Sequence, residues 1–126
     1  MIVLGRITKQ IERDTGGEIK SGDIMIDDFH LNGHIPQKHS VELCQLGIEP
    51  FEYVRYIADS FCEIREGTNN SYLLISPHTS TEIKNIAAIT MELINGDGDK
   101  VCWLVRIAQP RNIKKLVKRR LVWMKK

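Results

Sequence analysis

The chain has 126 residues, 42% of them hydrophobic and 27% charged, with a net charge of +2, which is typical of one folded domain. This composition excludes a largely disordered chain, and no apolar run reaches the roughly 20 residues of a membrane span. The opening residues lack the features of a signal peptide, and three widely spaced cysteines indicate a reducing compartment. We therefore expect a single cytoplasmic domain over residues 1–126.

Positive charge is concentrated at the C-terminal end. The basic segment 111–126 contains eight Lys and Arg residues and no acid, so it carries +8 while residues 1–110 carry −6. Such a segment adds salt-dependent affinity for phosphate groups, although a solvated helix face that only aids solubility is the alternative. We expect RNA as a partner, with Lys115 and Arg119 among its contacts.

In chain order, the first expected element is a helix over residues 3–15, where apolar side chains recur at helical spacing. Gly16 and Gly17 end it, because glycine accepts the left-handed conformation that terminates helices. Residues 23–27 alternate well enough to form a brief strand.

Two further helices are predicted from proline positions. Proline lacks an N–H and is tolerated at a helix start, so Pro36 begins a helix that ends near Gly47. Pro50 begins the next, and the apolar residues between Phe51 and Phe61 follow a helical spacing.

The second half of the chain changes to a period of two. Four antiparallel strands are predicted at residues 62–66, 71–76, 85–94 and 100–108. Glycine and asparagine in segment 67–70 favour a tight hairpin, and residues 112–121 form a basic amphipathic helix. The expected fold class is α+β: N-terminal helices packed on a four-stranded antiparallel sheet, with a C-terminal basic helix.

Three of the four histidines lie between residues 30 and 40. His30 and His34 have the four-residue spacing of a helical metal site, but a glycine and a proline interrupt any helix there. No metal and no cofactor are therefore expected. Proton transfer is the other possibility, because histidine titrates near neutral pH, and it points to His34 and His39 beside the predicted helix start.

Metal-independent RNA cleavage needs a base for the 2′-hydroxyl, an acid for the leaving 5′-oxygen and a cation on the phosphate. The sequence offers Lys38 next to His39, and Arg65 and Arg106 on predicted strands. It lacks a glycine-rich phosphate loop and an H-E-x-x-H motif, which argues against nucleotide-dependent and zinc-protease chemistry.

Four stretches span about residues 18 to 123: GDIMIDDFHLNGHIPQKHS, the helix after LGIEP, IREGTNNSYLLI and the strand ending CWLVRIA. Together they resemble the phage-associated branch of the barnase/EndoU/colicin/RelE-like nucleases. The resemblance implies helices on a four-stranded antiparallel sheet and metal-independent RNA cleavage. His34 and His39 match its H-I-x-x-K-H element, with Lys38 alongside, and Ser71 matches its N-S position.

By this resemblance His39 and His34 are the catalytic acid and base, while Arg106, with Lys38 and Arg65, clamps the phosphate. The predicted function is a toxin-like or phage-associated endoribonuclease, with RNA and an immunity or antitoxin protein as partners.

The family commonly shows V-x-T-A on the last strand, but here the stretch is VRIA, so Ile107 stands where a hydroxyl is expected. An aliphatic side chain cannot donate to a phosphate. The alternative is therefore a degenerate, non-catalytic interaction module of phage or prophage origin. Trp103 and Trp123 are interpreted as packing residues, and Ser71 as either a turn hydroxyl or a substrate contact.

Overall fold

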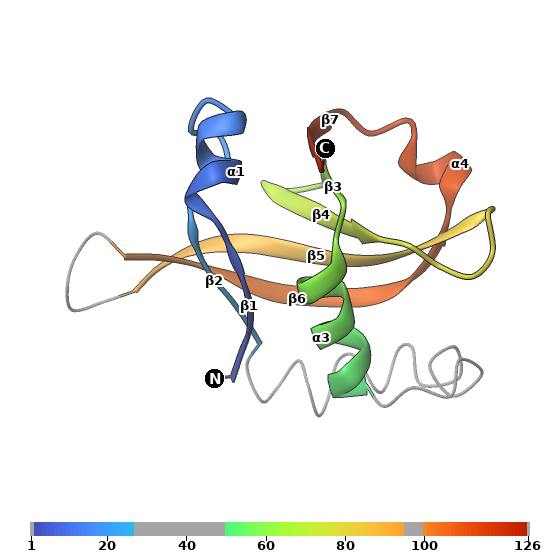
Figure 1. The fold of residues 1–126 in the computed structure, drawn as a ribbon, viewed down its shortest axis with the longest axis horizontal. Helices are drawn as coiled ribbons and strands as arrows, with labels where there is room; N and C mark the ends of the chain where they lie inside the picture. Colours follow the sequence, from blue (N-terminus) through green and yellow to red (C-terminus); the bar gives the residue numbers. More distant parts are fainter. Residues whose placement is uncertain (1, 27–49, 95–99, 126) are drawn as a thin grey trace.

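A computed structural model describes residues 2–26, 50–94 and 100–125 (Figure 1). The elements are β1 (Ile2–Ile7), α1 (Lys9–Asp14), β2 (Gly22–Ile26), α3 (Pro50–Ser60), β3 (Glu63–Glu66), β4 (Ser71–Ser76), β5 (Ile83–Ile94), β6 (Lys100–Asn112), α4 (Ile113–Leu116) and β7 (Leu121–Met124). The strands form one seven-stranded sheet in the order β1-β2-β6-β5-β4-β3-β7.

The predicted fold class is wrong. The described residues form a mixed sheet of seven strands with three short helices, rather than a four-stranded antiparallel sheet beneath N-terminal helices. β2 and β6 are parallel, whereas the other neighbouring strands are antiparallel.

The N-terminal error has a local cause. Residues 2–7 form strand β1, and the helix begins only at Lys9, capped by the Thr8 hydroxyl. The pairing of β1 with β2 shifts register between Val3 and Gly5, so Leu4 is an extra residue in the strand. This bulge places Leu4 and Ile7 in the core at a spacing of three, which mimics the periodicity of a helix.

The predicted C-terminal helix over residues 112–121 is also wrong. β6 continues to Asn112, whose side chain caps the four-residue helix α4. The chain then returns as β7, in which Trp123 pairs with Ile64 of β3 at the sheet edge. Trp123 packs edge-on against Phe61, with 5.8 Å between ring centroids. Part of the basic segment therefore belongs to the sheet.

Other predictions are confirmed. α3 begins at Pro50, β4 to β6 include the predicted strands, and β3 covers the predicted strand 62–66 except Cys62. Asn69 and Asn70 have φ values of 52° and 63°, as a tight hairpin requires, and Gly16 and Gly17 are left-handed at 63° and 88°. The predicted helix from Pro36 to Gly47 lies outside the described residues.

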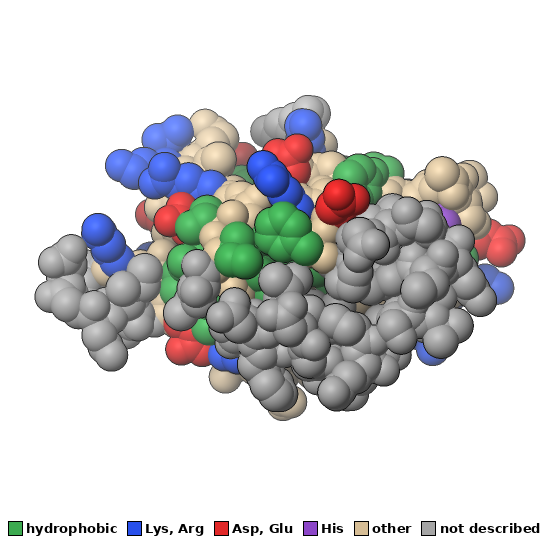
Figure 2. Space-filling model, turned by 90° about the horizontal axis from the view of Figure 1, so that it is seen from below, with side chains coloured by type: hydrophobic (Ala, Val, Ile, Leu, Met, Phe, Trp, Pro, Cys, Tyr) green, Lys and Arg blue, Asp and Glu red, His purple; other side chains and the backbone are tan. Residues whose placement is uncertain are grey.

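The sheet has a hydrophobic cluster on each face. Neighbouring residues of a strand point to opposite faces, and Leu74 accordingly joins the core under α3 while Leu73 joins a smaller cluster with Leu116 of α4. The face seen from below in Figure 1 carries hydrophobic side chains between basic and acidic ones (Figure 2). None of the described helices has the length and apolar character needed to cross a membrane.

Candidate functional site

The structure tests only some of the predicted site residues. His34, Lys38 and His39 lie outside the described residues. Arg106, Arg65, Ser71, Lys115 and Arg119 are described, and the structure separates them into three groups.

Arg106 occupies a bulge in β6. The register between β5 and β6 passes from Ala88 opposite Ile107 to Ile89 opposite Val105, which leaves Arg106 as the extra residue. A bulge redirects a side chain and is common beside functional sites, because the extra residue leaves the regular alternation of the strand.

Two side chains of β5 hold the Arg106 guanidinium. Its Nε donates to the Thr90 hydroxyl at 2.9 Å, and its Nη2 lies 2.8 Å from Oε1 of Glu92. The Arg106 and Glu92 side chains are 38% and 45% exposed, so the pair faces solvent. A guanidinium has more N–H donors than these two bonds use, and the others are available to an anion.

Ser71 lies beside this group but is engaged in its own turn. Ser71 pairs with Thr90 across β4 and β5, and the Thr90 hydroxyl in turn accepts the bond from Arg106 of β6. The Ser71 hydroxyl donates to the carbonyl of Thr68 at 2.6 Å, and the Ser71 N–H donates to the same carbonyl at 3.0 Å. These bonds fit the interpretation of Ser71 as a turn hydroxyl.

Arg65 belongs to a different group. Its Nε donates to Glu63 at 3.0 Å and its Nη1 to the carbonyl of Arg119 at 2.8 Å, so Arg65 joins β3 to the segment after α4. β3 and β6 have two strands between them, and at about 4.8 Å per strand they are roughly 14 Å apart. Arg65 therefore does not share the Arg106 group.

The cations on and after α4 form the third group. Lys114, Lys115 and Lys118 are exposed on and after α4, and Arg119 is half-buried. Arg120, in contrast, is bound by two carboxylates: its Nε lies 2.8 Å from Glu66, and its Nη2 forms an ion pair with Glu18. The basic segment thus contributes both solvent-facing charge and a structural ion pair.

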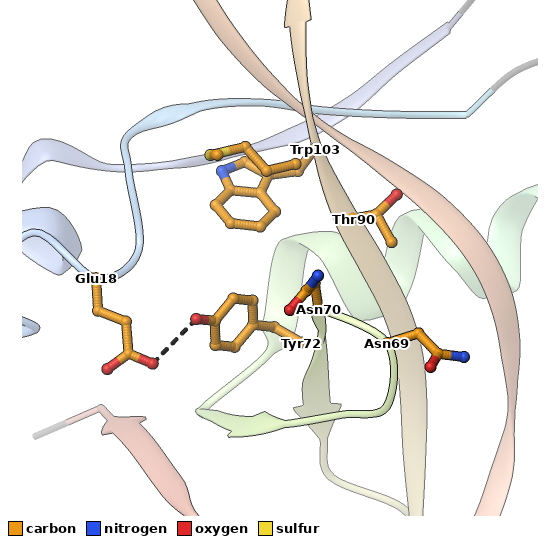
Figure 3. A pocket seen from close by; sticks show the side chains of 7 residues that line it. Glu18, Asn69, Asn70, Tyr72, Thr90 and Trp103 are labelled. Carbon is orange, nitrogen blue, oxygen red and sulfur yellow. Dashed lines mark hydrogen bonds between the residues drawn. The ribbon is translucent and has the colours of Figure 1, made fainter.

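A pocket of about 470 Å³ lies at the N-terminal end of β4. The longer β5–β6 ribbon continues past this point (Figure 1), because β4 pairs with β5 only as far as Thr90 among the described residues. Figure 3 shows the pocket, whose lining consists of Glu18, Asn69, Asn70, Tyr72, Thr90, Met91 and Trp103. Thr90 lines the pocket, but its hydroxyl bonds Arg106 on the sheet face opposite Tyr72 and Met91.

Hydrogen bonds fix the aromatic wall of this pocket. The Trp103 indole N–H donates to the carbonyl of Lys20 at 2.8 Å, and the Tyr72 and Trp103 rings meet edge-on with centroids 5.8 Å apart. The Tyr72 hydroxyl donates to Glu18 at 3.0 Å. Hydrogen bonding from Arg120 holds the pKa of Glu18 below its ordinary value, whereas burial and the Glu18 carboxylate raise the pKa of Tyr72.

The sequence prediction missed Thr90, Glu92, Tyr72 and Glu18. Thr90 and Glu92 are two residues apart on a correctly predicted strand, so both face the neighbouring strand from one side of the sheet. Their spacing is a usable signal once the hairpin register is known. Glu18 had no such signal, since its partners Tyr72 and Arg120 are 54 and 102 residues away.

The arrangement has two parts on opposite faces of the sheet: a solvent-facing guanidinium suited to an anion, and a pocket with aromatic and amide walls. The described side chains include no group of three His, Cys, Asp or Glu residues suited to a metal ion. Comparisons with protein-family models, curated proteins and solved structures gave no match. The nuclease resemblance therefore stays a prediction from the sequence.

Proposed function

We propose that this chain is a metal-independent endoribonuclease, toxin-like or phage-associated, that cleaves RNA by general acid/base catalysis. The observation that supports it best is Arg106, whose guanidinium is held by Thr90 and Glu92 with N–H donors left for a phosphate. A positioned guanidinium stabilises the charge that develops on the phosphate oxygens during cleavage.

In the proposed reaction a base removes the proton of the 2′-hydroxyl, and the 2′-oxygen attacks the adjacent phosphorus. The bond from phosphorus to the 5′-oxygen breaks, and an acid protonates that oxygen. The products carry a 2′,3′-cyclic phosphate and a 5′-hydroxyl. His39 and His34 are the proposed proton carriers and Lys38 a further phosphate contact; these three assignments come from the sequence alone.

The roles of phosphate binding, positioning and RNA attraction are proposed for described residues. Arg106 is proposed to touch the phosphate, and Glu92 to act as a positioning residue that keeps the guanidinium extended from the bulge. Lys115 and Arg119 would attract the RNA backbone at longer range, since α4 and the segment after it carry exposed cations. Free Cys62 and Cys102 agree with the further proposal of a cytoplasmic location.

The test is incubation of purified protein with total RNA, with and without EDTA. We expect fragmentation that EDTA leaves unchanged and that His39→Ala abolishes. His78→Ala is the matched control, because His78 lies in the loop between β4 and β5, where its Nδ1 accepts a bond from the Ser80 N–H. Identical RNA patterns with and without protein would reject the proposal.

A second candidate is a non-catalytic nucleic-acid or protein interaction module. It is favoured by Ile107, which pairs with Ala88 beside the bulge and offers no hydroxyl next to Arg106. This module would bind RNA, or an acidic partner such as an immunity or antitoxin protein, through the exposed cations. Salt-sensitive RNA binding without fragmentation would select it over the nuclease.

A further inference from the structure

We propose that the pocket at the end of β4 binds one unpaired nucleobase of a single-stranded RNA. The inference rests on the proposed function, because Arg106 is taken to hold a phosphate of the same RNA. It assigns a ligand class to a site that the catalytic proposal does not use.

The pocket offers the contacts by which proteins hold bases. Single-stranded bases stack on aromatic rings and form hydrogen bonds through their edges. The Tyr72 ring is half-buried and lines the pocket, while the Met91 side chain is 47% exposed at the same site. Trp103, only 1% exposed, supports this wall from within the core.

The Tyr72 ring is held in place before any ligand arrives. Its hydroxyl donates to Glu18, and Glu18 is bound in turn by Arg120, so three distant segments meet behind the ring. These bonds engage both carboxylate oxygens and neutralise the charge of Glu18. The pocket wall is therefore a pre-organised ring, and ligand binding need not order it.

The rim supplies groups that can read a base edge. Asn69 and Asn70 form the tip of the β3–β4 hairpin, and both side chains line the pocket (Figure 3). An amide side chain both donates and accepts hydrogen bonds, which suits the mixed pattern on the edge of a base. Among the described residues, β5 also lacks a strand neighbour on this side from Met91 onward.

Thr90 connects the base site to the phosphate site. It lines the pocket, and its hydroxyl accepts the bond from Arg106 Nε. Because neighbouring strand residues alternate, Tyr72, Met91 and Trp103 lie on the sheet face under α3, whereas the Thr90 hydroxyl and Arg106 lie on the opposite face. An RNA strand would therefore pass round the open edge of β5 between the base site and the phosphate site. A cation across this edge favours an anionic chain that carries bases over an uncharged apolar ligand.

The experiment uses a 2′-O-methyl oligoadenylate, which lacks the 2′-hydroxyl needed for cleavage, so that binding is measured without turnover. Its affinity for the wild type is compared with that for Tyr72→Leu, Tyr72→Phe and the control Tyr56→Leu, a tyrosine exposed on α3. We expect Tyr72→Leu to bind about tenfold more weakly, since stacking of a base on an aromatic ring has that order of effect. Tyr72→Phe, which keeps the ring but loses the bond to Glu18, should bind with an affinity between those of the wild type and Tyr72→Leu, and Tyr56→Leu should bind as the wild type does.

The same affinities are also measured for an abasic oligomer, a sugar-phosphate chain of the same length that carries no bases. The wild type and Tyr72→Leu should bind it equally, because it has no base to stack, and this equality also shows that the variant is folded. In a Trp123→Phe background Trp103 is the chain's one remaining tryptophan, and its fluorescence should change when oligoadenylate binds. Equal affinity of the wild type and Tyr72→Leu for oligoadenylate would overturn the inference even if RNA is cleaved. The reverse result, base-dependent binding without RNA cleavage, would reject the nuclease and keep the pocket.

Discussion

Arg106 and Glu92 lie on neighbouring strands, and the Nη2 of Arg106 is 2.8 Å from Oε1 of Glu92. This pair forms because β6 bulges at Arg106 and directs its side chain toward Thr90 and Glu92 of β5. Both partners are solvent-facing, so the pair is worth little for stability. Its consequence is positional: it fixes a solvent-facing guanidinium on the sheet face opposite Tyr72 and Met91.

Replacing Arg106 should therefore affect activity far more than folding. We expect Arg106→Ala to lower kcat/KM for RNA about 100-fold, the order seen when one charge-stabilising donor is removed. Arg106→Lys should recover only part of this loss, because an ammonium cannot bond Thr90, Glu92 and a phosphate in the same planar geometry. Steady-state cleavage of a fluorescent RNA measures both. Arg55→Ala, an exposed arginine on α3, is the control, and an equal loss in that variant would contradict the assignment.

The exposed lysines near α4 should control the salt dependence of RNA binding. Changing Lys114, Lys115 and Lys118 to Gln should flatten the plot of log Kd against log salt, by about 0.7 for each phosphate of a single-stranded RNA that is no longer neutralised. Fluorescence anisotropy over a salt series measures this slope. Charge neutralisation is preferable to truncation, since residues 121–124 form strand β7 and deletion would expose its partner β3.

A control triple variant removes the same charge elsewhere. Its substitutions, on β1 and α1, are Arg6→Gln, Lys9→Gln and Arg13→Gln. Their salt slope should match that of the wild type. If both triple variants change the slope equally, the α4 cations have no special part in RNA binding.

Two tyrosines of α3 provide a matched test of the core. The Tyr53 hydroxyl is buried and donates to Oδ1 of Asn85 at 2.8 Å, while the exposed Tyr56 hydroxyl donates to the Pro77 carbonyl at 3.3 Å. Tyr53→Phe should lower the free energy of unfolding by about 1–3 kcal/mol, because it leaves a buried amide oxygen without its donor. Tyr56→Phe should change it by about 0.5 kcal/mol or less. Urea unfolding measures both, and equal effects would contradict the described packing.

Glu18 should make stability depend on pH in a defined direction. Its pKa lies below the ordinary value of 4.5 in the folded protein, mainly through hydrogen bonds from Arg120. A lowered pKa stabilises the fold above pH 4.5, and this contribution is lost as the pH falls through the folded-state pKa. Glu18→Gln should therefore be less stable than the wild type at neutral pH, and the difference should shrink below pH 4.5.

Urea unfolding at neutral pH and below pH 4.5 checks this prediction. Glu52→Gln, at an exposed position on α3, serves as the control and should not reproduce the pattern. A stability difference between Glu18→Gln and the wild type that is constant across the range would show that the Glu18 charge is not involved.

The central strands could be predicted because their alternation is regular and their turn residues are specific. Asn69 and Asn70 adopt the positive φ angles that a tight hairpin needs, and Pro50 begins α3. The first strand could not be predicted in this way. Its bulge at Leu4 gives the spacing of a helix, and only pairing with β2 shows it to be a strand.

The candidate site shows the same division. Position on a predicted strand selects Arg106 and Arg65 equally, and the bulge at Arg106 and its partner Glu92, which set it apart, depend on the register of two strands. The helical spacing of Leu116, Val117 and Leu121 predicts a helix in the tail, whereas strand pairing with β3 decides the conformation of residues 121–124. The Arg106 bulge and the strand at residues 121–124 both depend on pairing between distant segments, which local periodicity does not reveal.

The central claim is RNA cleavage through a 2′-hydroxyl without a metal ion. Mass spectrometry of the ends formed from one defined RNA in the presence of EDTA tests it most directly. We predict new ends that carry a 2′,3′-cyclic phosphate and a 5′-hydroxyl, formed by the wild type and by Arg55→Ala but strongly reduced with Arg106→Ala. Intact RNA, or fragments that end in a 3′-hydroxyl, would contradict the account.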